Sequence, residues 1–218
     1  MGKKAKAEKK SKREKKAKSK GAKAGEPPKS RGMTVLEAIR SRRSVKKYDG
    51  REVSREEVER ILDAAAQAPN HHMTEPWRFY VLGPHARRAY GEVLGGRKAK
   101  KVEDAEAAAL VRTKVAAEHE ALPCAVAVAM KVAEDAERQR EDYAATFMAV
   151  QNLCLAAWSL GLGTHIKTGA VMDDPGARAA AGVGPDERVV AFVYVGRPEQ
   201  VPAPKERTTA ASLTVWRD

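Results

Sequence analysis

Two nearly unbroken apolar runs constrain the fold of this 218-residue chain more than any other feature. The first is "PCAVAVAMKV" at residues 123–132, and the second lies in "ERVVAFVYVGRP" at residues 187–198. A strand with one face in water alternates apolar and polar residues, so a run without alternation predicts a strand buried on both faces. The chain therefore needs a central sheet and enough helices to cover it.

Helical patterns occupy much of the remaining sequence. One helix is expected from Thr34, and Ser54 with Glu57 forms a capping box that opens a second helix. No G-x-G-x-x-G follows a strand and no regular βαβ alternation is present, so the sequence predicts an α+β domain instead of a dinucleotide-binding fold. The other expected elements are a strand in "WRFYVLG", helices at 84–95 (interrupted by "GGRK"), 103–120 and 138–160, a Gly-rich connector at 161–171, and an Asp-capped helix in "DDPGARAAAGV".

The formal net charge of +12 is concentrated in one segment. Residues 1–30 hold 13 Lys and Arg against three Glu, so they carry +10 and leave residues 31–218 close to neutral. Low hydrophobicity with high charge predicts a disordered Lys-rich tail and linker, followed by a single domain over residues 31–218. Two interpretations of the tail stay open: a solvated segment without a specific role, or weak nonspecific contact with nucleic acid or another polyanion.

Cys124 and Cys154 each lie inside an apolar run, which predicts buried, reduced thiols in a cytoplasmic protein. The tail lacks the apolar core of a secretion signal, and no apolar run approaches the roughly 20 residues of a membrane span. No CxxC or HxxH spacing indicates zinc.

The stretch "RSRRSVKKY" (residues 40–48) gathers five basic side chains around Ser44 near the end of the first helix. Guanidinium groups bind phosphate oxygens bidentately and a hydroxyl adds a further bond, so one interpretation is an anion site. A solvated basic turn is the other interpretation, because basic clusters are common.

The loop "APNHHMTEPWRF" (residues 68–79) holds polar and aromatic groups between two prolines. In an extended segment, neighbours such as His71 and His72 point to opposite sides, so we expect no metal site. No serine offers the turn of a catalytic nucleophile. A rigid loop of this composition suits contact with the polar edge of a flat heterocycle, and a purely structural loop is the alternative.

The segment "GLGTHIKTGAV" (residues 161–171) offers a close backbone approach through its glycines and a positive charge from Lys167. The order and spacing of the three segments are more informative than any one of them. Together they resemble the nitroreductase family of FMN-dependent oxidoreductases, and over roughly residues 33–200 the chain is most similar to the small YdjA-like members.

This resemblance implies a small central, mostly antiparallel sheet flanked by helices, in an intertwined homodimer with FMN at the interface. Each cofactor site would be built from both chains. The residues that match cofactor-binding positions of the family are Arg42, Arg43, Ser44, Lys46, His71, Glu75, Lys167, Thr168 and Gly169.

The resemblance also implies a role for each position. Residues 42–44 match the contacts to the FMN phosphate and the pyrimidine edge, and Lys46 matches the basic residue near flavin N1 and O2. Residues 167–169 match a second phosphate-binding turn, and His71 matches a flavin contact. Glu75 stands where the family has Gln, and a carboxylate cannot donate a hydrogen bond, so its contact with the flavin stays open. The region after Pro198 matches the family poorly and is assigned no contacts.

The implied chemistry is ping-pong hydride transfer through flavin N5, from NADH or NADPH to a nitroaromatic, a quinone or a related electrophile. No side chain is expected to act as a catalytic acid or base. Two alternatives stay open: specialised flavin chemistry on the same scaffold, such as dehalogenation or dehydrogenation, and a cofactor-poor module that its basic tail tethers to polyanions.

Overall fold

The computed structural model describes residues 32–218, so the predictions made for the Lys-rich tail lie outside the described residues. Most expected elements are present within a residue or two of their predicted bounds. In chain order they are α2 (Val35–Ser41), α3 (Arg55–Ala66), the 3-10 turn η1 (His71–Met73), β1 (Trp77–Val81), α4 (Pro84–Ala99), α5 (Ala105–Glu120), β2 (Cys124–Lys131), α6 (Ala136–Ser159), β3 (Gly163–Lys167), α7 (Pro175–Ala181), β4 (Glu187–Gly196) and the 3-10 turn η2 (Ala210–Leu213).

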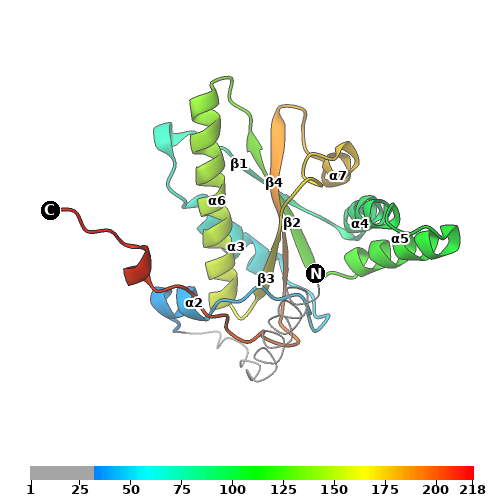
Figure 1. Cartoon of the computed structure of the whole chain (residues 1–218), viewed down its shortest axis with the longest axis horizontal. Coiled ribbons are helices and arrows are strands. Elements are labelled where there is room, and N and C mark those ends of the chain that lie inside the picture. The colour runs from blue at the N-terminus through cyan, green and yellow to red at the C-terminus, as the bar shows by residue number, and fades with distance from the viewer. Residues whose placement is uncertain (1–31) are drawn as a thin grey trace, which may run out of the picture.

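The four strands form one sheet in the order β1-β2-β4-β3, and every neighbouring pair is antiparallel (Figure 1). The two apolar runs become β2 and β4, which lie side by side in the middle of the sheet. The prediction of an α+β domain built on a small antiparallel sheet is therefore confirmed.

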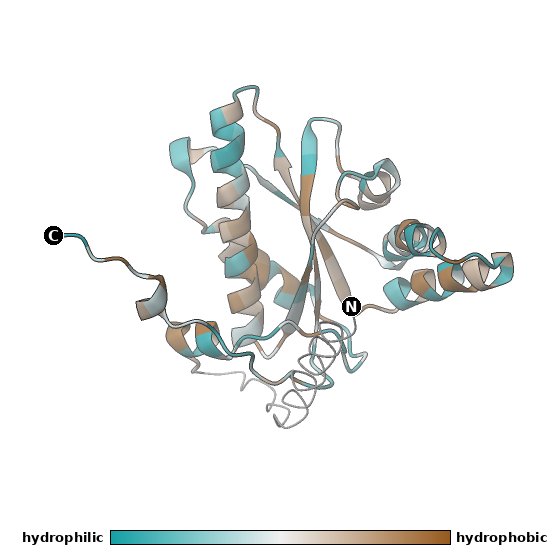
Figure 2. Cartoon of the chain, viewed as in Figure 1, coloured by the Kyte–Doolittle hydropathy of each residue, from teal (hydrophilic) through white to brown (hydrophobic). Residues whose placement is uncertain are grey.

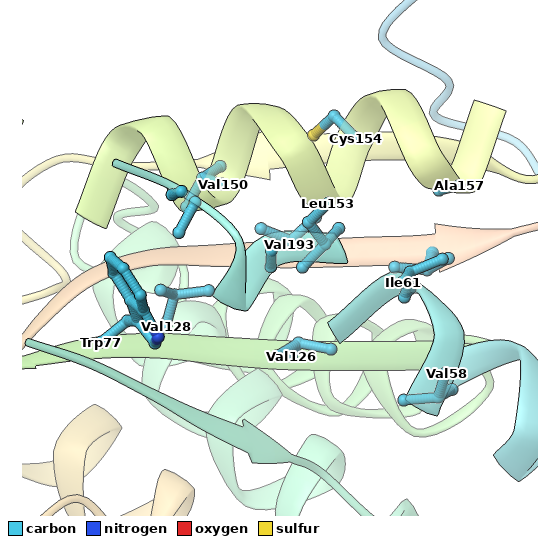
Figure 3. Close-up of a cluster of buried hydrophobic side chains, with 14 of the residues drawn as sticks. Val58, Ile61, Trp77, Val126, Val128, Val150, Leu153, Cys154, Ala157 and Val193 are labelled. Carbon is cyan, nitrogen blue, oxygen red and sulfur yellow. The ribbon is translucent and has the colours of Figure 1, made fainter. Parts of the chain in front are cut away.

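Side chains alternate between two apolar layers across the central strands. Val126 and Val193 face α3 and α6 on one side, in the cluster drawn in Figure 3, whereas Ala127 and Phe192 pack with residues of α4 and α7 on the other side. Each face needs apolar residues because each is covered by helices, which explains why the sequence shows no polar alternation here. Figure 2 shows this hydrophobic centre, while the N-terminal turns of α6 are hydrophilic.

The capping signals that the sequence offered are present. Ser54 Oγ accepts a hydrogen bond from the backbone N–H of Glu57, and the Glu57 carboxylate accepts one from the backbone N–H of Ser54. Thr34 and Glu37 form the same reciprocal pair at the start of α2. These bonds satisfy backbone donors that have no partner within the helix.

The prediction that "GGRK" interrupts the helix at 84–95 is wrong, because α4 continues to Ala99. The glycines allow α4 and α5 to approach closely. A Cβ on Gly91 would lie 2.8 Å from the Cα of Ala116, and one on Gly95 would lie 2.9 Å from the Cα of Arg112. The space requirement of the neighbouring helix therefore outweighs the low helix propensity of glycine.

The prediction of a Gly-rich connector at 161–171 is also wrong in part, since residues 163–167 form the edge strand β3. β3 pairs with β4 over its whole length, and Thr164 is opposite Val195. Glycine at 163 is required by packing: a Cβ there would lie 2.5 Å from Cγ2 of Val45.

Several apolar side chains do not join the core. The helix α2 exposes Val35, Leu36 and Ile39, and the C-terminal segment, which Figure 1 shows leading away from the body, exposes Val215 and Trp216. Along α6, the predicted apolar stripe is buried at its C-terminal end and exposed at Tyr143. Among the described helices, none combines the length and the apolar character of a membrane span.

Both cysteines are buried free thiols, as the sequence predicts. Burial raises the pKa of Cys124 to about 11 and also raises the pKa of Cys154.

Candidate functional site

The basic segment after α2 is fixed against the edge of the sheet. Ser44 forms a parallel bridge with Thr164, and the backbone N–H of Val45 donates to the carbonyl oxygen of Thr164 over 2.9 Å. Val45 is fully buried, so its neighbours Ser44 and Lys46 point to the opposite side of the extended segment. The core thus orients the polar side chains of this segment.

The end of α2 is anchored by a second contact. The indole Nε1 of Trp158 on α6 donates to Ser41 Oγ over 2.8 Å, and Trp158 is itself almost fully buried. The guanidinium of Arg43 folds back, because its Nη1 donates to the carbonyl oxygens of Arg40 and Arg42. Arg43 therefore helps to hold the turn, in addition to adding positive charge.

A cavity of about 840 Å³ opens beside this segment. One wall is the basic segment, from Ile39 to Lys47 without Ser41 and the buried Val45, and the opposite wall comes from residues 200–205 and 207. Among the described residues that line it, none is acidic and seven are Lys or Arg. The seven are Arg40, Arg42, Arg43, Lys46, Lys47, Lys205 and Arg207.

Lys205 and Arg207 are functional candidates that the sequence analysis missed, since it assigned no contacts after Pro198. The sequence feature that marks them is a pair of basic residues, separated by one residue, in "PAPKER". This segment has no large apolar side chain that could join the core. No local sequence pattern in that segment indicates that it faces Arg42 across the cavity. The return of the chain along the basic turn, marked by the bridge between Tyr48 and Pro198, brings the two walls together.

The residues 167–169 lie at the far end of β3 and do not line this cavity. Lys167 follows Thr164, which lies beside Ser44, by three residues along β3, and this distance is about 10 Å at about 3.3 Å per residue. The pKa of Lys167 is lowered, first by burial and then by the positive charges of Lys98 and Lys46. Thr168 lines a second cavity, of about 600 Å³, with the end of α4.

His165 lies two residues before Lys167 in β3, and the positive charges of Lys167 and Lys46 also affect it. Burial is the main cause that lowers its pKa to about 4, and the charges of Lys167 and Lys46 add to the effect. Its imidazole is therefore neutral at physiological pH. Gly169 has a φ of 109°, a left-handed conformation that favours glycine and shapes the turn after β3.

The loop 70–75 is compact and strained. His72, Met73 and Glu75 have φ values of 57°, 50° and 41°, in a region that L side chains seldom occupy. The loop is tied down by Thr74 Oγ1, which donates to Asp142 Oδ1 over 2.6 Å, and by the N–H of Glu75, which donates to Asn70 Oδ1. Backbone strain of this kind persists where the surroundings impose it, and it is frequent at functional sites.

The prediction that His71 and His72 point to opposite sides is wrong, because residues 71–73 form a 3-10 turn in place of an extended segment. The two rings stack with centroids 3.7 Å apart, and His71 Nδ1 lies 3.0 Å from Glu141 Oε2. Ligand atoms of His71, His72 and Glu141 lie within 4.8 Å of one another. Ring nitrogens bind metals in the plane of the ring, and a metal here would have to displace the contact between His71 and Glu141.

The predicted cofactor residues form two groups that one chain does not bring together. His71 contacts Glu141 near the start of α6, whereas the basic segment is tied to Trp158 near its end. The helix rises about 25 Å between these two contacts, at about 1.5 Å per residue. Figure 1 shows the η1 turn, in cyan, beside one end of α6 and α2 beside the other end. Glu75 belongs to the same distant loop and is exposed.

Comparison with known proteins agrees with this architecture. The chain is 32% identical over 175 residues to "Putative NAD(P)H nitroreductase YfhC" of Bacillus subtilis, covering 80% of this chain and 89% of the relative. It is 29% identical over 174 residues to "Putative NAD(P)H nitroreductase YdjA" of Escherichia coli, covering 77% and 90%.

Solved structures give the same result. A nitroreductase-like family protein from Bacillus cereus superposes with a TM-score of 0.74 at 25% identity, covering 87% of this chain and 99% of that one. A nitroreductase with bound FMN from Bacteroides fragilis superposes with a TM-score of 0.66 at 26% identity, covering 85% and 100%. The model of the nitroreductase family matches residues 39–197. The chain belongs to the nitroreductase family.

Proposed function

We propose that this chain is an FMN-dependent oxidoreductase that takes electrons from NADH or NADPH and reduces nitroaromatics, quinones or related electrophiles in ping-pong turnover. The observation that carries the proposal is the cavity beside β3, which seven Lys and Arg side chains line and to which none of residues 32–218 contributes a carboxylate. A dianionic phosphate monoester suits such a lining, because guanidinium and ammonium groups both neutralise it and donate hydrogen bonds. FMN, when bound, supplies the hydride acceptor at N5 and the electron donor for the second substrate.

The side chains around the cavity have different roles toward FMN, according to their chemistry. Arg42, Lys205 and Arg207 neutralise the phosphate, and the hydroxyl of Ser44 adds a hydrogen bond. Lys46 points the same way as Ser44, two residues closer to the Lys167 end of β3, so it provides positive charge along the path from the phosphate to the flavin ring. Negative charge that develops on the ring during reduction would be stabilised by Lys46 and by the backbone N–H groups of Thr168 and Gly169, which follow the last residue of β3.

A homodimer would unite the two separated groups of candidate residues. The loop 70–75 lies about 25 Å along α6 from the basic segment of its own chain, so its His71 would reach a flavin only in the cavity of a second copy. The exposed apolar side chains of α2 and of the C-terminal segment support such an interface; Leu36 is 61% exposed and Trp216 is 89% exposed. Exposed apolar surface of this kind is frequent at association sites, and a two-fold dimer would bury it twice.

Two further expectations belong to this proposal. Buried reduced thiols at Cys124 and Cys154 support a reducing, cytoplasmic environment. The basic tail would add weak, salt-sensitive contact with polyanions, and this contact is independent of the flavin chemistry.

Fluorescence titration of FMN against the wild type and two variants tests the phosphate site. Arg42→Ala with Ser44→Ala is expected to weaken FMN affinity at least tenfold, since it removes a charge-assisted contact and a hydroxyl contact. Arg60→Ala is the matched control, because Arg60 is an exposed cation on α3 that does not line the cavity. Equal FMN affinity in all three proteins would contradict the assigned phosphate site.

Sedimentation equilibrium tests the dimer. The expected mass is twice the chain mass of 23.7 kDa. Leu36→Glu is expected to yield monomers with weakened FMN binding, whereas Leu110→Glu, which is equally exposed at 65% on α5, is expected to leave the dimer intact. A wild-type monomer that binds FMN tightly would refute the shared site.

A further inference from the structure

The second cavity is also lined by cations. It lies between the C-terminal end of α4 and the turn that follows β3, with a volume of about 600 Å³. Four cations line it, and Thr168 contributes the opposite wall. The cations are Arg97, Lys98, Lys100 and Lys101.

The charges of this cavity are poorly compensated. Arg97 pairs with Asp174 over 3.2 Å, but the three lysines form no ion pair with any of residues 32–218. Lys98 is close enough to Lys167 to lower its pKa. Like charges gathered without counter-charges destabilise one another, and a bound anion would relieve this repulsion.

Stabilisation of the helix dipole explains only part of the arrangement. Cations in the last turn of a helix are favourable, which accounts for Arg97 and Lys98. Lys100 and Lys101 follow the last helical residue, Ala99, and they face the β3 turn across a cavity. A helix C-terminus also repels anions, so an anion can bind here only through the side-chain ammonium groups.

The position of the cavity relates it to the flavin site. Besides burial, two positive charges lower the pKa of Lys167. They are Lys98, which lines the second cavity, and Lys46, which lines the first. A row of positive side chains (Lys46, Lys167 and Lys98) thus runs beside β3 and the turn after it, from the first cavity to the second; we call this row the positive track. With the FMN phosphate at one end of the track, a substrate that meets the flavin ring near residues 167–169 has the second cavity beside it.

We propose that this second cavity binds the phosphate monoester that NADPH carries on its ribose and NADH lacks, so that the enzyme prefers NADPH. The inference rests on the proposed function. Pyrophosphate groups, which both nucleotides share, are typically bound by backbone N–H groups at a helix N-terminus. A terminal dianionic monoester instead suits several flexible ammonium groups without backbone donors, which is what α4 presents.

Steady-state kinetics with both nucleotides test the preference. The FMN-loaded wild type is expected to show kcat/KM at least tenfold higher for NADPH than for NADH. Lys100→Gln with Lys101→Gln is expected to lower kcat/KM for NADPH about tenfold per lysine, while the value for NADH changes less than twofold. Lys114→Gln is the matched control, since Lys114 is an exposed lysine on α5 that does not line the cavity.

Binding of adenosine 2′,5′-bisphosphate and of 5′-AMP by calorimetry gives a readout without turnover. The bisphosphate is expected to bind tighter, and the double variant is expected to abolish this difference. Three results would each overturn the inference: equal use of both nucleotides by the wild type, an equal loss for both nucleotides in the variant (a site for the shared pyrophosphate), or loss of FMN from the variant (a site for the flavin phosphate). Failure of the wild type to bind FMN would instead overturn the proposed function, and the FMN spectrum distinguishes the two failures.

Discussion

Gly163→Ala should displace the basic segment from the sheet edge. A Cβ on Gly163 would lie 2.5 Å from Cγ2 and 2.7 Å from Cβ of Val45. Carbon atoms are in favourable contact at about 3.5–4.0 Å, so the two backbones must separate by about 1 Å. Val45 is fully buried and β-branched, and its restricted χ1 prevents the side chain from turning away.

The size of the effect follows from this overlap. Overpacking of a core costs about 1–3 kcal/mol, and alanine recovers about 0.4–1 kcal/mol by restricting the unfolded chain. We therefore expect the free energy of unfolding to fall by about 1–2 kcal/mol. Ser44 and Lys46 flank Val45, so a shift of about 1 Å also misaligns the phosphate contacts, and we expect FMN affinity to fall about tenfold.

Urea unfolding and fluorescence titration with FMN measure both effects on the same protein. Gly96→Ala is the matched control, because a Cβ there meets nothing within 4 Å and helix propensity favours alanine. The control is expected to keep wild-type FMN affinity and equal or greater stability. If Gly163→Ala matches the control in both measurements, the close contact with Val45 does not position the site.

Three further results are expected. Arg207→Ala should weaken FMN binding about tenfold, an effect that shrinks at high salt, while Arg217→Ala, which lies outside the cavity, should leave it unchanged. The pKa of His165 is lowered to about 4, so on acidification the unfolded chain binds a proton before the folded chain does. The free energy of unfolding should therefore fall as pH drops from about 6.5 through 4. A His165→Gln variant with the same pH dependence as the wild type would contradict this. Cys124 and Cys154 should resist a thiol reagent until urea unfolds the chain, and rapid labelling of the native protein would refute their burial.

The fold could be predicted from the sequence wherever the signal is local. The apolar runs gave β2 and β4 because burial on both faces leaves a clear pattern. The glycines led to the wrong predictions at "GGRK" and at 161–171, because a glycine can either weaken a helix or strand or permit close packing inside one. It weakens a helix by its own propensity, but Gly95 and Gly163 serve distant neighbours, Arg112 and Val45, that no local window contains.

The candidate site could be predicted only in part, for the same reason. Arg42 to Lys46 stood out as a dense basic stretch, yet the opposite wall, with Lys205 and Arg207, comes from the far end of the chain. The resemblance implied a cofactor site built from both chains, without saying which of His71 and Arg42 each chain would supply. Their placement at opposite ends of α6 depends on helix length and packing, which motif order does not reveal.

The most direct test of the flavin account is an anaerobic absorbance spectrum of the purified protein with added FMN, followed by NADPH and then by a quinone or nitroaromatic. The account predicts flavin bands that stay with the protein through gel filtration, bleach on addition of NADPH and return with the oxidant. A protein that releases all FMN, or bound flavin that neither nicotinamide nucleotide bleaches, would contradict it.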